Sequence, residues 1–254
     1  MIKFFFNKTF FKYIYVLIVL CFVFLLANLP AKYIFSVVKL PENIKVSSVT
    51  GTIWSGTIKQ LSISGIKLGG VSWRMLPERL ILGQLSSNIS LNKKEQFFRA
   101  NISVSALGRF ELKETDFFID SALLQPLLYG MPFSYSGTAK GCFPSIEFLE
   151  NNYIRMNGEI SIKDAKLISP QQQLFGDFVA SFKIEKENKT LVIVKSIDSP
   201  LIMSGKIKLT ETGRIDVSAK MAARSDEPAL DKMLLFFGPK DEQEQVEFKQ
   251  QLQL

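Results

Sequence analysis

The sequence predicts a mainly β protein, with a single amino-terminal transmembrane helix followed by a curved antiparallel β meander and a few short helices. Two observations predict it: an uncharged apolar run near the amino terminus, and many short segments in which apolar and polar residues alternate. The chain has 254 residues and is 47% hydrophobic, which is enough apolar material for a core. The meander can be an open sheet or a groove, and alternation alone does not choose between them.

The apolar run covers residues 13–31 and contains no charged residue. A helix over it is about 28 Å long at about 1.5 Å per residue, which matches the apolar core of a bilayer. The preceding lysines, Lys3, Lys8 and Lys12, favour a cytoplasmic amino terminus. A cleaved signal peptide has the same orientation, but this run is longer than the apolar part of a usual signal. We expect a cytoplasmic stub over 1–12, a retained anchor over 13–31 and an exported β-rich domain over 32–254.

Alternation with a period of two recurs along the rest of the chain and indicates strands that each have one apolar face. It is clearest in 85–91, 178–185 and 215–221. In the first of these, leucine and isoleucine occupy one face, while serine and asparagine occupy the other. The pattern continues in 160–162, 207–209 and 246–254, with turn residues at 187–188 and 211–213. Short strands joined by such turns favour an antiparallel meander with one covered side.

Three stretches interrupt the alternation and are expected to be short helices. The first begins near Pro77 and ends at Gly83. The second begins at Asp120, and Pro126 limits its length. The third is expected to run from a cap at Ser225 or Asp226, through Pro228 and the apolar stripe Leu230, Met233, Leu234 and Phe237, to a stop at Gly238-Pro239.

Histidine is absent from the sequence, which excludes imidazole-dependent catalytic triads, His-containing zinc or haem sites and histidine proton shuttles. The cysteines Cys21 and Cys142 are too few for a thiolate metal cage. One lies in the predicted anchor and the other outside it, so no disulfide is expected between them. No glycine-rich phosphate loop precedes a predicted helix. We therefore expect no enzyme activity, no cofactor and no metal.

The formal net charge is +7, from 31 basic and 24 acidic residues. Part of this excess lies in the amino-terminal lysines, and the rest is spread along the chain with no run denser than Lys93-Lys94. A dispersed excess of this size is typical of a solvated surface rather than of a phosphate-backbone interface. Nucleic acid is therefore not an expected partner.

Two motifs between residues 46 and 91 carry a family resemblance. The first is Gly51-Thr52-Ile53-Trp54-Ser55-Gly56, of the form G-x-hydrophobic-W-S-G. The second runs from Trp73 through Pro77 and Leu80 to Gly83, of the form W-x-hydrophobic-x-P-x-x-L-hydrophobic-x-G. Segments at 158–162, 201–209 and 236–239 extend the similarity. The chain thus resembles the type II secretion system protein N family, also called general secretion pathway protein N.

The resemblance implies a non-enzymatic, single-pass component of the bacterial inner membrane, with a cytoplasmic amino terminus and most of the chain in the periplasm. Such a component helps the assembly or function of the machinery that exports folded proteins from the periplasm across the outer membrane. Its implied partners are the inner membrane and other inner-membrane or periplasmic components of the system. For Trp54 and Trp73, packing in the protein core and contact with a partner both remain open.

A second hypothesis belongs to another class: a membrane-anchored periplasmic lipid-binding or lipid-transfer module. Strands with a consistently apolar face and few helices to cover it can form a groove for lipid. The carboxyl-terminal segment 246–254 is also expected to be an edge strand. Such an edge can pair with a strand of another chain, or its polar side chains can blunt it.

Overall fold

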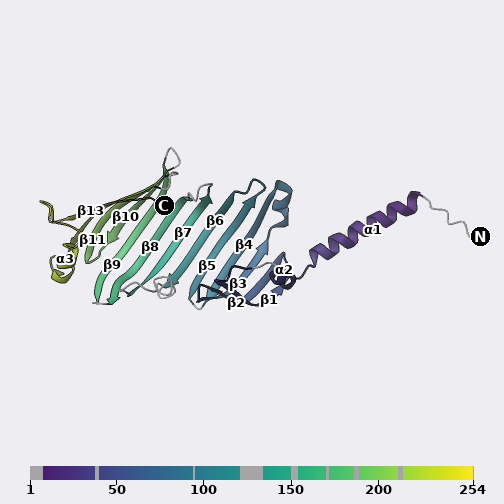
Figure 1. Cartoon of the computed structure of the whole chain (residues 1–254), viewed down its shortest axis with the longest axis horizontal. Helices are drawn as coiled ribbons and strands as arrows, with labels where there is room; N and C mark the ends of the chain where they lie inside the picture. Colours follow the sequence, from purple (N-terminus) through teal and green to yellow (C-terminus); the bar gives the residue numbers. More distant parts are fainter. Residues whose placement is uncertain are drawn as a thin grey trace, which may run out of the picture.

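Thirteen strands form one antiparallel sheet in the computed structural model of the chain, which describes residues 8–37, 40–93, 95–120, 134–149, 154–169, 172–185, 189–210 and 214–253. The strands are β1 Ile44–Gly51, β2 Ser55–Ile63, β3 Ile66–Met75, β4 Gln84–Lys93, β5 Gln96–Ser105, β6 Phe110–Asp120, β7 Ser134–Phe148, β8 Ile154–Ser169, β9 Gln173–Glu185, β10 Lys189–Ile197, β11 Leu201–Leu209, β12 Arg214–Ala223 and β13 Val246–Gln253. Their order in the sheet is their order in the sequence. Figure 1 shows one long layer with β1 beside the amino-terminal helices and β13 at the other end.

The predicted antiparallel meander is therefore confirmed, and the sheet is open. The segments with the clearest alternation, 85–91, 178–185 and 215–221, lie within β4, β9 and β12. The segment 246–254 forms β13, one of the two edge strands, as expected. The predicted turns at 187–188 and 211–213 lie outside the described residues.

One face of the sheet is apolar from end to end, because the strand registers align the alternation of successive strands. A single row of cross-strand partners consists of Val49, Ile58, Val71, Leu91, Phe98, Phe117, Gly141, Ile160, Ala180, Val194, Gly205, Ala219 and Phe248. At a spacing of about 4.8 Å between strands, this apolar row is about 58 Å long.

The opposite face is polar over the same length. Its matching row consists of Thr50, Thr57, Ser72, Ser90, Arg99, Asp116, Cys142, Glu159, Ser181, Ile193, Lys206, Ser218 and Lys249. Ile193 is the one purely hydrocarbon side chain in this polar row. A shift of one residue in any single pairing would exchange the two faces beyond that point, so the rows define the register.

Aromatic rings on the apolar face lie over glycines of neighbouring strands. A Cβ atom built on Gly141 would overlap the ring of Phe117, and one built on Gly158 would overlap the ring of Phe143. The centroids of the Phe117 and Phe143 rings are 6.3 Å apart, and those of Phe143 and Phe182 are 5.2 Å apart. Glycine thus leaves room for a run of packed rings across β6, β7 and β9.

The amino-terminal segment differs from the predicted continuous anchor over 13–31. It forms two helices, α1 Lys8–Ala27 and α2 Ala31–Val37. Pro30 separates them, because proline lacks an N–H and disfavours helical geometry at the residue before it. Within the described residues, no helix combines the length and apolarity needed to cross a membrane. The predicted span is therefore not confirmed, and the helical boundaries are 8–27 rather than 13–31.

The other described helices are short. A 3-10 helix, η1 Pro77–Leu82, ends at Gly83 as predicted, and Gly83 adopts the left-handed conformation with φ of 69°. The predicted helix from Asp120 lies outside the described residues, except that Asp120 itself ends β6. The described helices pack near the two ends of the sheet: α2 against β1, η1 against β4, and α3 Pro228–Leu234 against β9, β11, β12 and β13.

The third predicted helix is present as α3 Pro228–Leu234, but its boundaries were wrong. Its N-cap residue is Glu227 rather than Ser225 or Asp226, and the helix ends before Phe237. Leu230 and Leu234 enter a buried cluster with Phe178, Leu201 and Val246, which is the core at the far end of the sheet. Phe237 leaves this stripe and is 50% exposed.

Candidate functional site

The first motif joins the sheet to the amino-terminal helices. The indole Nε1 of Trp54 donates a hydrogen bond to the carbonyl of Leu26, in the last turn of α1, at 2.9 Å. The backbone N–H of Ile53 donates to the carbonyl of Leu29 at 3.0 Å, and Pro30 forms a β-bridge with Thr52. These bonds use carbonyls that a helix end leaves without intrahelical partners. Trp54 therefore connects α1 to the β1–β2 turn.

The two glycines of this motif allow the turn to be tight. Gly51 has φ of 93°, a conformation that disfavours side chains, and a Cβ on it would overlap the backbone at Ser55 and Gly56. The N–H of Thr52 donates to the carbonyl of Ser55 at 2.8 Å, which closes the turn. Ser55 thus contributes its backbone, at the first residue of β2.

The second motif packs against the first. A Cβ on Gly56 would overlap the outer ring atoms of Trp73, which lies opposite Gly56 in the β2–β3 register. Trp73 Nε1 donates to the carbonyl of Ile53 at 3.0 Å, and its ring centroid lies 6.0 Å from that of Phe35 in α2. Trp73 therefore covers a glycine of the neighbouring strand. Trp54 makes a helix contact instead, which the sequence did not indicate.

Pro77 also belongs to this helix–sheet joint, which we define as Gly51–Gly56, Trp73 and Pro77. It lines an apolar hollow of about 370 Å³ with Val23, Leu26, Ala27 and Trp54. Leu80 and Gly83 lie farther along η1, where the Gly83 N–H donates to the Leu80 carbonyl at 3.0 Å. The structure thus brings six of the eight motif residues together at the end of α1, namely Gly51, Trp54, Ser55, Gly56, Trp73 and Pro77.

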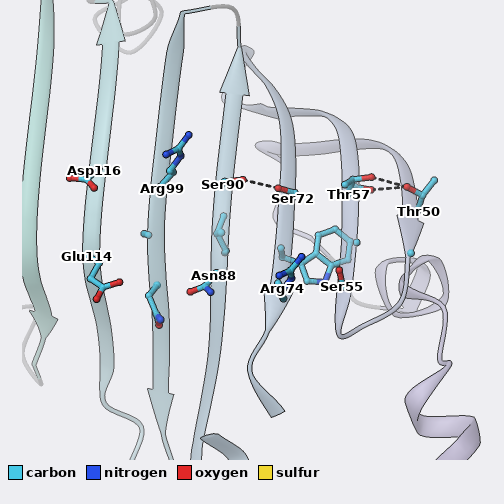
Figure 2. A pocket seen from close by; sticks show the side chains of 16 residues that line it. Thr50, Ser55, Thr57, Ser72, Arg74, Asn88, Ser90, Arg99, Glu114 and Asp116 are labelled. Carbon is cyan, nitrogen blue, oxygen red and sulfur yellow. Dashed lines mark hydrogen bonds between the residues drawn. The ribbon is translucent and has the colours of Figure 1, made fainter. Parts of the chain in front are cut away.

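A polar hollow of about 800 Å³ lies over the first six strands (Figure 2). Hydroxyl pairs line part of it, with the Oγ1 atoms of Thr50 and Thr57 2.8 Å apart and the Oγ atoms of Ser72 and Ser90 2.7 Å apart. Its charged side chains are Arg74, Arg99, Glu114 and Asp116. Motif matching missed this hollow, because its side chains meet only through the register of several strands.

A β-bulge supplies one of these charges. The β5–β6 register shifts between Arg99 and Asn101, and Glu114 has φ of 48°. The extra residue on β6 places Glu114 on the polar face beside Asp116, as Figure 2 shows. A hollow with hydroxyls, guanidinium groups and carboxylates can hold polar ligands, but it has no histidine or activated nucleophile for acyl or phosphoryl transfer.

Cys142 lies in the polar row between Asp116 and Glu159. A hydrogen bond to the Asp116 carboxylate raises the pKa of the exposed Cys142 thiol, and some loss of hydration and the negative charges of Asp116 and Glu159 act in the same direction. Lys140 opposes them weakly. Both cysteines are free, and the raised pKa of Cys142 keeps its thiol mostly protonated and poorly nucleophilic near neutral pH.

Charged side chains pair at the far end of the polar face. Arg214 Nε lies 2.9 Å from an Asp216 carboxylate oxygen, and Gln251 donates to the same oxygen at 2.7 Å. These hydrogen bonds lower the pKa of Asp216. Backbone N–H groups of Gln245 and Gln243 lower the pKa of Asp241 in the loop before β13. No group of acidic or cysteine side chains in the described part of the chain has the arrangement of a metal site.

The family model for type II secretion system (T2SS), protein N, matches residues 42–249. This match begins just after α2 and covers nearly the whole sheet. The chain belongs to the type II secretion system protein N family. Both motifs of the helix–sheet joint lie within the matched region, so the resemblance of the sequence is confirmed.

Curated members of the protein N family give the same result at modest identity. The type II secretion system protein N of Vibrio cholerae serotype O1 is 25% identical over 168 residues, which cover 65% of this chain and 67% of the relative. That of Klebsiella pneumoniae is 25% identical over 231 residues, or 89% of each chain. No solved structure gives a significant match.

We predict that Gly56→Ala will destabilise this protein N domain by about 1–3 kcal/mol, because the new methyl group would overlap both the Trp73 ring and the backbone carbonyl of Thr50. Gly70→Ala is the matched control in the neighbouring strand, since the nearest atoms to its Cβ are 3.6 Å and 3.7 Å away, and it should change stability by less than about 0.5 kcal/mol. Urea unfolding in detergent, followed by circular dichroism, measures both. Equal midpoints for the two variants would contradict the ring-over-glycine packing.

We also predict that the Cys142 thiol reacts slowly with maleimide despite its exposure, in a Cys21→Ala background. The pH at half-maximal rate should lie above the ordinary value for cysteine, since the raised pKa keeps the thiolate fraction low. Asp116→Asn should lower this midpoint and increase the rate at pH 8. Glu159→Gln is the control and should shift it less, because Glu159 contributes least. A larger shift for Glu159→Gln than for Asp116→Asn would be the opposite result.

Proposed function

We propose that this protein is a non-enzymatic component of the type II secretion machinery, attached to the bacterial inner membrane by α1 in a single pass. In this proposal the amino terminus is cytoplasmic and the sheet lies in the periplasm. There the sheet contacts other inner-membrane or periplasmic components and helps the assembly or function of the machinery. The observation that carries the proposal is the family match over residues 42–249, together with the joint between the matched sheet and α1.

The surface of α1 supports membrane attachment. Every described side chain from 11 to 28 is exposed, and the helix is apolar on all sides, with examples such as Leu17, Phe22 and Phe24 at 60% exposure or more. A helix that is hydrophobic all round requires apolar surroundings. Lys8 and Lys12 lie at its amino-terminal end, which favours retention of that end in the cytoplasm.

The helix–sheet joint supports a positioning role for the family motifs. Trp54 bonds to α1, Trp73 packs against α2, and Pro77 shares a hollow with α1. A rigid connection at this point fixes the orientation of the sheet relative to α1, the proposed membrane attachment. Binding partners would then meet the sheet in a defined orientation, which is a scaffold function that needs no catalytic residue.

Deletion of the gene in a bacterium with an active type II system is expected to move secreted enzymes from the medium to the periplasm. Complementation with the full chain should restore export, and the protein should stay in the membrane pellet after carbonate extraction. Trp54→Ala, which removes the bond to α1, should restore export less well than the wild type. Normal secretion by the deletion strain would refute the proposed role, and release by carbonate would refute the membrane attachment.

A lipid-binding module is the second candidate function, and the apolar row favours it. The row crosses all strands. Helices α2 and η1 contact β1 and β4, and α3 packs on β9 and the strands after it, so β5, β6 and β7 have no described covering helix. Leu91, Phe98, Phe117 and Ile160 remain only half-buried. An uncovered apolar face of this length can hold acyl chains.

Photo-crosslinking in cells can test lipid binding without the background of lipid around α1. A benzoylphenylalanine at Ile160 faces the apolar side, and one at the adjacent Glu159 faces the polar side of the same strand. If the face binds lipid, mass spectrometry should find phospholipid adducts at position 160 and far fewer at 159. Equal yields at both positions, or none at 160, would exclude this function.

A further inference from the structure

Large apolar side chains are exposed at one corner of the sheet. Ile81, Leu82 and Leu107 are 88%, 72% and 82% exposed, and Leu80 is 43% exposed. The first two and Leu80 belong to η1, and Leu107 lies in the β5–β6 turn. The two segments are joined, because the Ala106 N–H donates to the carbonyl of Gly83 at 2.9 Å. Contiguous exposed apolar surface of this kind marks an interaction site.

This corner lies on the same lateral edge of the sheet as the end of α1. In a meander of consecutive strands, the β1–β2, β3–β4 and β5–β6 connections share one edge. The β1–β2 connection makes backbone contacts with Leu29 and Pro30, which follow α1. Pro77, at the start of η1, lines the hollow with Val23 and Leu26 of α1. Pro77 therefore places the start of η1 beside the end of α1, on the lateral edge that also carries Ile81 and Leu82.

Helix α2 adds to the same surface. It follows α1 directly, and its Tyr33, Ile34 and Val37 are 57%, 39% and 80% exposed, whereas Ala31 is buried and Phe35 packs on Trp73. The helix thus has an inward side that contacts the sheet and an outward side with apolar groups. Tyrosine at the end of an apolar helix is typical of a membrane interface.

Basic side chains accompany these apolar groups. Lys32 in α2, Arg79 in η1 and Arg109 after the β5–β6 turn are all exposed, and Glu78 is the carboxylate of η1. Apolar groups beside cationic ones match the boundary between acyl chains and anionic headgroups.

We propose that η1, the β5–β6 turn and the outward side of α2 form an interfacial collar that inserts into the periplasmic leaflet around the end of α1. The occupant of this surface is the lipid bilayer, with its anionic headgroups near Lys32, Arg79 and Arg109. The inference rests on the proposed attachment of α1 to the membrane. It adds further contact segments, which hold this lateral edge of β1–β6 against the bilayer and limit how far the sheet can tilt.

A second exposed apolar cluster, far from α1, provides a control for the collar. Leu235, Phe236 and Phe237 are 52%, 89% and 50% exposed. They follow α3, in the β12–β13 connection on the opposite lateral edge and at the other end of the sheet. The chain beyond them is acidic, with Asp241, Glu242 and Glu244. This cluster cannot reach the membrane together with η1, so it serves as the internal control.

The test places one spin label at a time on the full chain in proteoliposomes of phosphatidylethanolamine and phosphatidylglycerol. The background carries Cys21→Ala and Cys142→Ser. The labelled variants are Ile81→Cys, Leu107→Cys and Phe236→Cys, with native Cys21 in a Cys142→Ser chain as the reference within α1. All of the substituted collar and control side chains are exposed, so the substitutions leave the packed parts of the sheet intact. Collision rates with oxygen report lipid, and those with a water-soluble nickel chelate report water.

The collar predicts a severalfold higher ratio of oxygen to nickel collisions at positions 81 and 107 than at position 236. Ratios at 81 and 107 equal to that at 236, with position 21 in lipid, would overturn the collar but leave the membrane attachment standing. Position 21 in water would overturn both. Low collision rates with both reagents at 81 and 107 would indicate burial of this surface against protein, such as a second copy of this chain, and would also overturn the collar.

The charged side chains provide a second, independent readout. More phosphatidylglycerol should increase the oxygen-to-nickel ratio at position 107, because anionic headgroups draw Arg79 and Arg109 to the surface. Arg79→Gln combined with Arg109→Gln should remove most of this dependence, whereas Lys232→Gln beside the distal cluster should leave it unchanged. An unchanged dependence in the double variant would contradict the assigned role of the two arginines.

Discussion

Cross-strand register is the constraint on which the rest of this protein depends. Because each strand pairs only with its neighbours in sequence, nothing but the register of twelve successive pairings keeps apolar side chains on one face and polar ones on the other. The described sheet has no second layer over its middle strands that would correct an error. Bulges, such as the one at Glu114, absorb extra residues locally without exchanging the faces beyond them.

Where the described sheet has no second layer, side chains must pack against neighbouring strands of the same sheet, and aromatic rings over glycines provide this packing. Trp73 over Gly56, Phe117 over Gly141 and Phe143 over Gly158 each place a large flat group where the neighbouring strand has no side chain. The same device serves two purposes. Along the middle strands it thickens the apolar face, whereas at β2 and β3 it fixes the turn to which α1 and α2 are attached.

Alternation in the sequence predicted an antiparallel meander and located segments of β4, β8, β9, β11, β12 and β13, because a period of two is a local property of each segment. It did not locate the other strands. The proline between α1 and α2 was visible in the sequence, yet the apolar run across it favoured one long helix. Ser225 and Asp226 have good capping side chains, but Pro228 occupies the first turn and moves the cap to Glu227. The polar hollow was not predictable, since Arg74, Arg99 and Asp116 meet only after three registers are known.

The consecutive strand order has a further consequence for how the chain acquires its structure. Contacts between strands lie almost entirely between those adjacent in sequence, so each new strand needs only the previous one as a template. The entropy of closing each short connection is small. The sheet can therefore form by addition of one strand after another from its amino-terminal end as the polypeptide emerges. Its stability is then approximately a sum of terms for neighbouring strand pairs. Damage to one strand then divides the layer into two shorter sheets instead of unfolding it as a unit.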